Sequence, residues 1–464
     1  MEIQNAKYVD IAPLISFRIL FGLLMAVGGI RFWYEGWIVK LFVEPKLFFK
    51  YYGFEWVEVP SEMGLYALFL VMIVSALCIA FGFIYRVMSV LFFCSFTYIE
   101  LLDATNYLNH YYLIICFAFL LIFLPANSAF SLDVKFSWVK QRKWIPRWNI
   151  DVLKAQLLLV YTCAGIAKLN SDWLFQGMPM AVWLPERSEM PLLGILFGIK
   201  GMPLFFSWCG AIYDLSIAWF LLFSRTRTIA YFFVVVFHLM TFMMFNIGLF
   251  PFIMIFLTTI FFEGQTHRKV LQKIGFNSSN NFDKQPSHTA QKPNLLYPER
   301  TVRRYDRGVQ ASKNFNNRPT TKAVVLIFIL IQFLMPFRHW LYKGDVLWTE
   351  EGYRFSWRVM VVEKNGQAIF SVSDPETGRT SEIINGQYLT LFQEKQMAIQ
   401  PDMMIQFAHF LDQEFQEKYS IENPVVKVQS SVALNGRSSR TFANPNVDLS
   451  KQQMSLKHYD WIDL

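Results

Sequence analysis

The sequence predicts a mainly α-helical, multi-pass membrane protein with a small α+β domain at its C-terminal end. Three observations support this fold class. Of the 464 residues, 54% are hydrophobic and 47 are phenylalanine, which is more apolar than a soluble core of this size requires. Several apolar runs have roughly 16 to 21 residues, close to the length that crosses a bilayer. After residue 342 these runs stop and shorter, turn-separated patterns begin.

Nine segments are candidate transmembrane helices, and some are shorter than the roughly 20 residues of a full crossing. Segments 229–245 and 247–262 are therefore also candidates for a re-entrant pair. If these two segments do not cross the membrane, the predicted side of every later loop and domain is unchanged. The nine candidates are 11–30, 64–84, 87–102, 111–124, 152–167, 204–223, 229–245, 247–262 and 323–341.

Basic residues between these segments predict the orientation. The loop between the fourth and fifth segments carries five Lys or Arg, and residues 263–322 carry twelve against four acidic residues. Basic loops stay in the cytoplasm, so both regions and the N-terminus are predicted to be cytoplasmic. The loop 31–63, on the other side, holds four basic and five acidic residues. The net charge of +8 is thus a topology signal and does not indicate a nucleic-acid partner.

The predicted domain boundaries follow from this pattern. Residues 1–262 form a helical transmembrane domain, and residues 323–342 form the last membrane helix. Residues 263–322 are polar and basic, which predicts a flexible cytoplasmic linker. Residues 343–464 then form a periplasmic or lumenal domain. The N-terminus lacks the basic region and cleavage site of a signal peptide, so the first apolar run is expected to be a retained helix.

The C-terminal domain is predicted from short patterns. Alternating β-branched and aromatic residues predict strands in YRFSWRVMVV (353–362), QAIFSV (367–372) and NPVVKVQSSVAL (423–434). The stretch DPETGR (374–379) is typical of a turn. PDMMIQFAHFLDQEFQEKY (401–419) has apolar residues at helical spacing after a Pro-Asp start. A small α+β domain on the outer face is expected.

Lys168, in YTCAGIAKLNSDW (161–173), is the ionisable residue that is hardest to place. It follows an apolar run, where an ammonium group is costly. It could extend its charged end into water while its alkyl chain stays in lipid. Alternatively, burial could hold the amine neutral and able to accept a proton, because removal from water disfavours the charged form. The spacing leaves both interpretations open.

Other polar residues in or beside the apolar segments raise similar questions. Asn109 and His110 begin the fourth segment, where they could cap the helix or orient a substrate hydroxyl and stabilise negative charge. His238 lies in mid-segment, either in a functional site or hydrogen-bonded to a neighbouring helix. Asp214 is interpreted as the partner of a buried donor. Arg18 could extend to water or pair in the same way.

The sequence does not predict a metal site. Its seven histidines are scattered, without HxxxH or HExxH spacing, and its five cysteines form no CxxC pair. Phosphate-binding and nucleotide-binding glycine motifs are also missing. Any chemistry is therefore expected to use a diffusible organic cofactor, and a lipid-soluble one could enter from the bilayer.

Six stretches, in order along nearly the whole chain, resemble the vitamin K-dependent gamma-glutamyl carboxylase family. Two of them contain the Asn109-His110 pair and Lys168. The stretches are FRILFGLLM (17–25), LLDATNYLNHYYL (101–113), AGIAKLNSDW (164–173), FHLMTFMMFNIGLF (237–250), MPFRHWLYKGDVLWTEEGYRFSW (335–357) and NPNVDL (444–449).

The resemblance implies an activity and a set of site residues. The family couples oxygenation of vitamin K hydroquinone to its epoxide with addition of CO₂ to the γ-carbon of a protein glutamate. By position, Lys168 matches the catalytic base that deprotonates the quinol, and Asn109 and His110 match residues that position or stabilise its anion. The positions implied for substrate binding are His238, His339, Tyr353, Ser356 and Trp357.

The resemblance also implies partners and a location. The cofactor would be vitamin K hydroquinone or menaquinol, with O₂ and CO₂ as co-substrates and no metal. The partner would be a glutamate-containing protein or peptide, in a membrane that supplies the quinol. The chain departs from the animal enzymes because Ala167 replaces the first of two adjacent lysines, and it has no counterpart of their disulfide or long lumenal extension. A bacterial homologue in the inner membrane is expected, and recognition of a propeptide stays open.

Two other functions remain alternatives. The chain could oxygenate a quinol without carboxylating a protein, and the sequence does not separate this activity from the full reaction. It could also be a non-catalytic membrane scaffold whose outer domain binds a partner. A scaffold, however, gives no reason to place Lys168, Asn109 and His110 on one side of the membrane near an intramembrane histidine.

Overall fold

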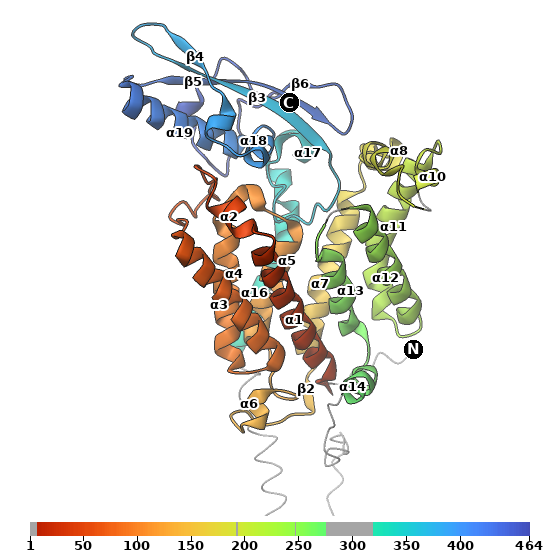
Figure 1. The fold of residues 1–464 in the computed structure, drawn as a ribbon. Helices are drawn as coiled ribbons and strands as arrows, with labels where there is room; N and C mark the ends of the chain where they lie inside the picture. The colour runs from red at the N-terminus through yellow and green to blue at the C-terminus, as the bar shows by residue number, and fades with distance from the viewer. Residues whose placement is uncertain (1–6, 192–193, 246, 275–318) are drawn as a thin grey trace, which may run out of the picture.

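The computed structural model describes residues 7–191, 194–245, 247–274 and 319–464. It is mainly helical, with a strand-containing region at the C-terminal end (Figure 1). Within the described residues, six helical segments are long and apolar enough to cross a membrane. They are α1 (Ala12–Tyr34), α3 (Glu62–Phe81), α7 (Trp148–Ala167), α11 (Met202–Leu222), α12 (Arg227–Met244) and Pro319–Leu341, which comprises α16 (Pro319–Leu334) and η4 (Met335–Leu341).

The other three candidate segments form shorter helices. They are α4 (Tyr85–Leu101, 17 residues), α5 (Asn109–Phe123, 15 residues) and α13 (Phe250–Leu257, 8 residues). Residue Pro251 lies in the first turn of α13, and a 3₁₀ turn, η3 (Thr258–Phe261), follows it. Even together, α13 and η3 are too short to cross a bilayer as a straight helix. The count of nine transmembrane helices therefore stays a prediction.

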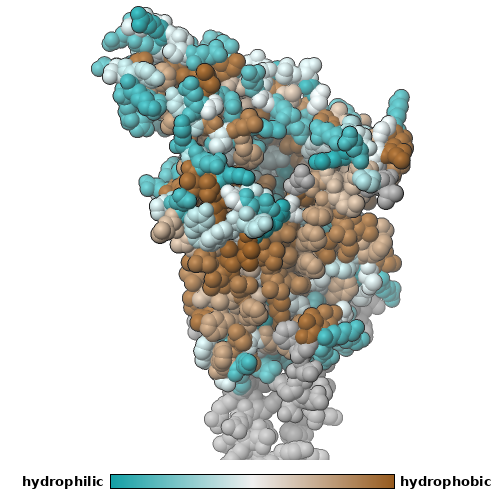
Figure 2. Space-filling model, in the orientation of Figure 1, coloured by the Kyte–Doolittle hydropathy of each residue, from teal (hydrophilic) through white to brown (hydrophobic). Residues whose placement is uncertain are grey.

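The helices form a bundle, and the face seen in Figure 2 carries an apolar band between polar surfaces at its two ends. At one end, β1 (Tyr8–Asp10) pairs with β2 (Trp144–Pro146), close to α6 (Leu132–Lys135) and α14 (Gly264–Lys273). The C-terminal domain lies at the opposite end (Figure 1). The N-terminal strand and the basic loop before α7 thus share one end, as the charge pattern requires. Which end is cytoplasmic stays a prediction.

The first part of the predicted linker is helical. Residues 264–273 form α14, which is held by the Arg268 guanidinium on the Asp10 carboxylate at 2.6 Å. His267 also bonds the Thr259 carbonyl through Nε2 at 2.9 Å. These contacts order a segment that composition alone marked as flexible. Residues 275–318, which make up most of the predicted linker, lie outside the described residues.

The C-terminal domain is built on a four-stranded antiparallel sheet of order β4-β3-β5-β6. Strand β3 (Lys364–Ser373) pairs with β5 (Val425–Leu434) over their full lengths, and α19 (Pro401–Tyr419) packs against both. These elements confirm two predicted strands and the predicted helix. The sheet is completed by β4 (Thr380–Glu382) and β6 (Arg440–Thr441), and α18 (Leu391–Met397) precedes α19.

The strand predicted over residues 353–362 is wrong, because this stretch consists of turns up to residue 357 and irregular backbone after it. Three of its residues have a positive φ, namely Phe355 (62°), Trp357 (56°) and Met360 (53°). Residues in this conformation cannot continue an extended strand, whatever their β propensity. We call residues 352–360 the junction loop, since they connect the last membrane helix to the C-terminal sheet.

Polar contacts dock the C-terminal domain on the bundle. The Gln393 amide, in α18, donates to the Leu47 carbonyl at 2.7 Å and to the Asp103 carboxylate at 2.9 Å. The Gln406 side chain, in α19, bonds both the N–H and the carbonyl of Lys50. These contacts fix the domain over the loops after α2 (Trp37–Phe42) and α4.

Candidate active site

The junction loop is held in its strained conformation by two side chains from the bundle and by one of its own. The Asn109 amide donates to the Arg358 carbonyl at 3.2 Å, and the Tyr353 hydroxyl donates to the same oxygen at 3.2 Å. The Lys168 ammonium donates to the next carbonyl, that of Val359, at 3.0 Å. Non-glycine residues with positive φ persist only where neighbours over-determine them. Two residues identified from the sequence, Asn109 and Lys168, therefore converge on consecutive carbonyls.

Asn109 does not cap its helix. The N-cap of α5 is Leu108, which makes no side-chain capping bond. Instead the Asn109 carbonyl oxygen accepts from the Tyr107 hydroxyl at 3.0 Å, while its amide reaches the junction loop. Tyr107 in turn accepts from the Phe355 N–H at 2.7 Å. The capping interpretation is wrong because the side chain serves the loop.

Lys168 is buried and paired. It follows the last residue of α7, its side chain is 5% exposed, and its Nζ lies 2.8 Å from Oδ2 of Asp214 in α11. Nζ also lies 5.1 Å from the centre of the Trp173 ring. Lys168 therefore does not extend its charged end into water, as one interpretation of the sequence had it. Lys168 is the buried donor that was expected to pair with Asp214. Such a pair can be ammonium and carboxylate, or amine and carboxylic acid, without a change of net charge.

Arg18 also does not extend to water. Its side chain is fully buried, and its guanidinium donates to the carbonyls of Ala126, Ala129 and Phe130. These contacts tie α1 to the loop before α6. Arg18 is therefore structural in this fold and lies outside the cluster around Lys168.

A second polar cluster lies between α7, α11 and α12. The Tyr161 hydroxyl and the His238 Nε2 are 3.0 Å apart, and both side chains are buried. The Tyr213 ring lies 6.2 Å from the His238 ring. Within the described part of the chain, neither His238 Nδ1 nor the Tyr213 hydroxyl has a hydrogen-bond partner. Unpartnered buried polar atoms are uncommon and need an explanation.

His110 is near this second cluster but not in it. The rings of His110 and His238 lie 5.3 and 5.9 Å from that of Phe250, the first residue of α13. No hydrogen bond or ion pair joins His110 to Lys168 in the described ranges. The structure therefore brings His110 close to His238 through an aromatic contact, and Asn109 close to Lys168 through the junction loop.

An apolar groove of about 580 Å³ opens between α11 and α12. We call it the membrane groove, because exposed apolar side chains such as Ile212, Ile229 and Phe233 border it within the apolar band. Tyr213 lines this groove and stacks on Phe237 with a centroid distance of 3.8 Å. Tyr213 therefore lies between a lipid-accessible groove and the buried His238.

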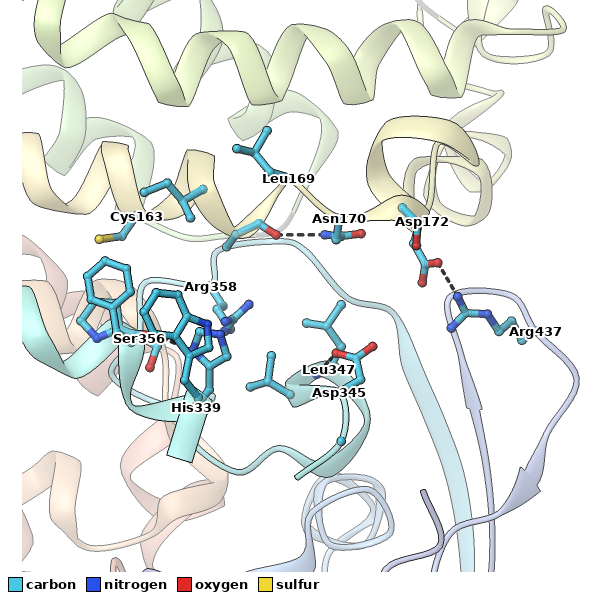
Figure 3. A pocket seen from close by; sticks show the side chains of 18 residues that line it. Cys163, Leu169, Asn170, Asp172, His339, Asp345, Leu347, Ser356, Arg358 and Arg437 are labelled. Atoms are coloured by element: carbon cyan, nitrogen blue, oxygen red, sulfur yellow. Dashed lines mark hydrogen bonds and ion pairs between the residues drawn. The ribbon is translucent and has the colours of Figure 1, made fainter. Parts of the chain in front are cut away.

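A second cavity, of about 350 Å³, lies between the end of α7, η4 and the C-terminal domain (Figure 3). We call it the outer pocket. His339 and Ser356, both identified from the sequence, line it together with Arg358 and Asp345. Trp357 does not line it, because its ring stacks on Tyr112 at 4.9 Å. Tyr353 contributes indirectly, by bonding the Arg358 carbonyl.

Three residues of this region were missed or undervalued from the sequence. Asp214 was identified only as a partner for a donor, although it pairs with Lys168. Tyr161 and Arg358 were not identified at all. The two opposite charges in apolar segments were an available signal for the Lys168–Asp214 pair. Nothing in the spacing could have placed Arg358 in a pocket, since that depends on the turns of the junction loop.

Within the described ranges, no group of three His, Cys, Asp or Glu side chains is arranged to hold a metal. The arrangement offers other chemistry. A buried amine–carboxyl pair can transfer protons, and an apolar groove beside unpartnered polar atoms can take an amphipathic ligand. The outer pocket, which is lined by apolar residues and by charged ones such as Arg358 and Asp345, can take the side chain of a water-soluble ligand.

Comparison with known families agrees with these features. Residues 6–265, more than half of the chain, match the HTTM domain. Residues 317–463 match the lumenal domain of vitamin K-dependent gamma-carboxylase. No solved structure is significantly similar to the chain. The two matches cover the helical bundle and the C-terminal region in the order expected, and the chain therefore belongs to the vitamin K-dependent gamma-carboxylase family.

Proposed function

We propose that this protein is an integral-membrane gamma-glutamyl carboxylase, in which Lys168 removes a proton from a quinol. Family membership supports the overall reaction. The observation that carries the proposal is the buried Lys168–Asp214 pair, bonded to the loop that forms the outer pocket. We assign residues 1–262 to the transmembrane domain and residues 343–464 to the periplasmic or lumenal domain, with the N-terminus in the cytoplasm. Reporter fusions at the two ends test this orientation.

The pair can accept a proton in either of its neutral forms, and it then carries one positive charge that faces the anion left on the substrate. In its ammonium–carboxylate form, Nζ can pass one proton to Oδ2 of Asp214 while it takes another from a hydroxyl. In its amine–acid form, Nζ accepts the proton directly. Asp214 therefore positions Lys168 in both forms. The buried site excludes water that would otherwise compete for the proton.

The residues near the pair fit a lipid-soluble quinol. The membrane groove is apolar and reaches Tyr213, whose hydroxyl lacks a partner, as does Nδ1 of the neighbouring His238. These two atoms would meet the polar head of a quinol, and the groove would hold its isoprenoid chain. When bound, the quinol reacts with O₂ and supplies the basicity needed to remove a glutamate γ-proton. Asn109 and His110 would orient the head. His339 and Ser356 would line the glutamate side of the site, and Tyr353 and Trp357 would support the loop behind it.

The test uses purified protein with vitamin K hydroquinone or menaquinol, O₂, labelled bicarbonate and a short glutamyl peptide. Epoxide and fixed label are followed separately. We expect both products from the wild type and neither from Lys168→Ala. Lys154→Ala is the matched control, because Lys154 lies on the same helix near the opposite end, against the Phe261 ring.

Other outcomes distinguish the alternatives. Epoxide without fixed label in the wild type would support a quinol epoxidase that lacks carboxylation. If neither quinol gives either product, the proposed function is contradicted and the non-catalytic scaffold is the remaining alternative. Equal loss in Lys154→Ala and Lys168→Ala would assign the effect to helix stability.

A further inference from the structure

The Arg358 side chain is a buried cation in the outer pocket. The residue is 9% exposed, and its Nε has no hydrogen-bond partner within the described residues. Figure 3 shows Arg358 near His339 and Ser356, whereas the pocket's other arginine, Arg437, lies beside Asp172. Arg437 is already paired, because its guanidinium contacts the Asp172 carboxylate. Arg358 is thus a donor that the protein places in a pocket but does not pair.

The backbone on both sides of Arg358 is held in an uncommon conformation. Trp357 and Met360, on either side of it, have positive φ values, and the Arg358 carbonyl is held by Asn109 and Tyr353. Burial lowers the pKa of Arg358, and Tyr353, Asp345 and Glu350 oppose that effect. A buried guanidinium without a bonded anion is costly, and strain of this kind gathers at ligand sites. Both costs are explained if a ligand anion completes the site.

We propose that the outer pocket binds the side-chain carboxylate of a glutamyl residue in the protein substrate, with Arg358 as its anchor. This inference rests on the proposed function and adds the residue that selects the acidic side chain. The planar guanidinium matches a carboxylate through two parallel hydrogen bonds. His339 contributes beside it, since its Nδ1 bonds the Pro336 carbonyl at 2.8 Å and its Nε2 is left for the ligand.

The pocket also distinguishes a monocarboxylate from a dicarboxylate. Asp345 lines it, with one oxygen accepting the Leu347 N–H at 2.9 Å. This fixed negative charge tolerates one ligand carboxylate that Arg358 neutralises. A second carboxylate on the same γ-carbon brings further negative charge toward Asp345, and like charges repel. The carboxylated product should therefore bind more weakly than the glutamyl substrate.

Direct binding tests the proposal without any turnover. A fluorescent pentapeptide containing Glu, Gln or gamma-carboxyglutamate is titrated into the purified full-length protein, without quinol or bicarbonate. We expect the Glu peptide to bind the wild type at least 10-fold more tightly than the other two. Arg358→Gln should weaken binding of the Glu peptide at least 10-fold and remove the preference for Glu over Gln. Arg358→Lys should keep part of that preference. Asp345→Asn should reduce the difference in affinity between the Glu peptide and the gamma-carboxyglutamate peptide.

Controls keep the outcomes separate. Arg379→Gln, in the exposed turn after β3, should bind as the wild type does. Equal binding of Glu and Gln peptides by the wild type would overturn the proposal whatever the variants do. Displacement of the Glu peptide by phosphatidylglycerol nanodiscs, but not by free glutarate, would assign the pocket to a lipid head group and also overturn it. Glu-selective binding without fixed label would refute the carboxylase function and leave this site intact.

Discussion

Replacement of Asp214 by Asn tests whether the buried pair works as a unit. At 2.8 Å, two unit charges attract with about 6 kcal/mol at an effective dielectric constant of about 20. Desolvation of both groups offsets part of this energy. Removal of one partner from a buried pair typically costs about 3–5 kcal/mol, because the other charge is left uncompensated. Asp214→Asn should therefore lower the free energy of unfolding by an amount in this range.

Activity should fall as well, for a separate reason. Asparagine cannot accept a proton from Lys168, so the ammonium–carboxylate route to quinol deprotonation is lost, and Lys168 also loses the carboxyl group that positions it in the amine form. Loss of general-base catalysis costs about 10²–10⁴-fold in rate, and epoxide and fixed label should fall together. The assay measures both products and thermal unfolding on the same detergent-purified samples. Asp151→Asn is the matched control. Asp151 lies in the first turn of α7, the helix that ends just before Lys168, and its ion pair with Arg147 is exposed.

A double substitution separates stability from chemistry. Replacement of a buried ion pair by apolar residues of similar volume is often neutral or stabilising. Lys168→Met combined with Asp214→Leu should therefore recover most of the lost unfolding temperature and remain inactive. Retention of near-wild-type product formation in Asp214→Asn would refute the reasoning. Recovery of activity in the double variant would do so too, because neither replacement can carry a proton.

Two further predictions concern other buried groups. Tyr161→Phe leaves Nε2 of His238 without its partner, which should cost about 1–3 kcal/mol of stability and raise the KM for the quinol more than that for the peptide in steady-state assays. In the C-terminal domain, burial lowers the pKa of Lys364 from 10.5 and raises that of Glu350 from 4.5. The unfolding free energy should rise with pH below 10.5, where the folded Lys364 has lost its proton and the unfolded lysine still holds one. It should fall as pH rises above 4.5, where the unfolded glutamate has lost its proton and the folded Glu350 still holds one. Denaturant titrations across pH should show that Lys364→Met removes the rise in unfolding free energy and that Glu350→Gln removes its fall. If the pH dependence of the unfolding free energy is unchanged in these variants, the assignments are contradicted.

The sequence predicted the features that depend on local pattern. The apolar runs of α1, α3 and α7 were identified within a few residues, and the helix over 401–419 matches α19 at both ends. Each of these signals lies within one segment. The turn at residues 374–379 likewise depends on its own Pro and Gly.

The features that were missed depend on contacts between distant segments. Residues 353–362 have strong β propensity, but Asn109 and Lys168, both more than 180 residues away in the sequence, hold them in turns. The pairing of Lys168 with Asp214 likewise depends on how α7 packs against α11. Propensity is a weak guide where tertiary contacts decide the backbone. Candidate site residues were identifiable by type, but not their partners.

The junction loop makes the two halves of the site depend on each other. Its carbonyls at Arg358 and Val359 accept hydrogen bonds from Asn109 and Lys168 of the bundle, while the Arg358 side chain lines the outer pocket. Without the loop, Lys168 would lose one of the acceptors that fix its Nζ beside Asp214. Without the bundle, the loop would lose the donors that hold its left-handed residues. The proposed proton acceptor and the proposed anchor for an acidic group therefore both depend on one short segment, and each domain supplies contacts that the other half of the site needs.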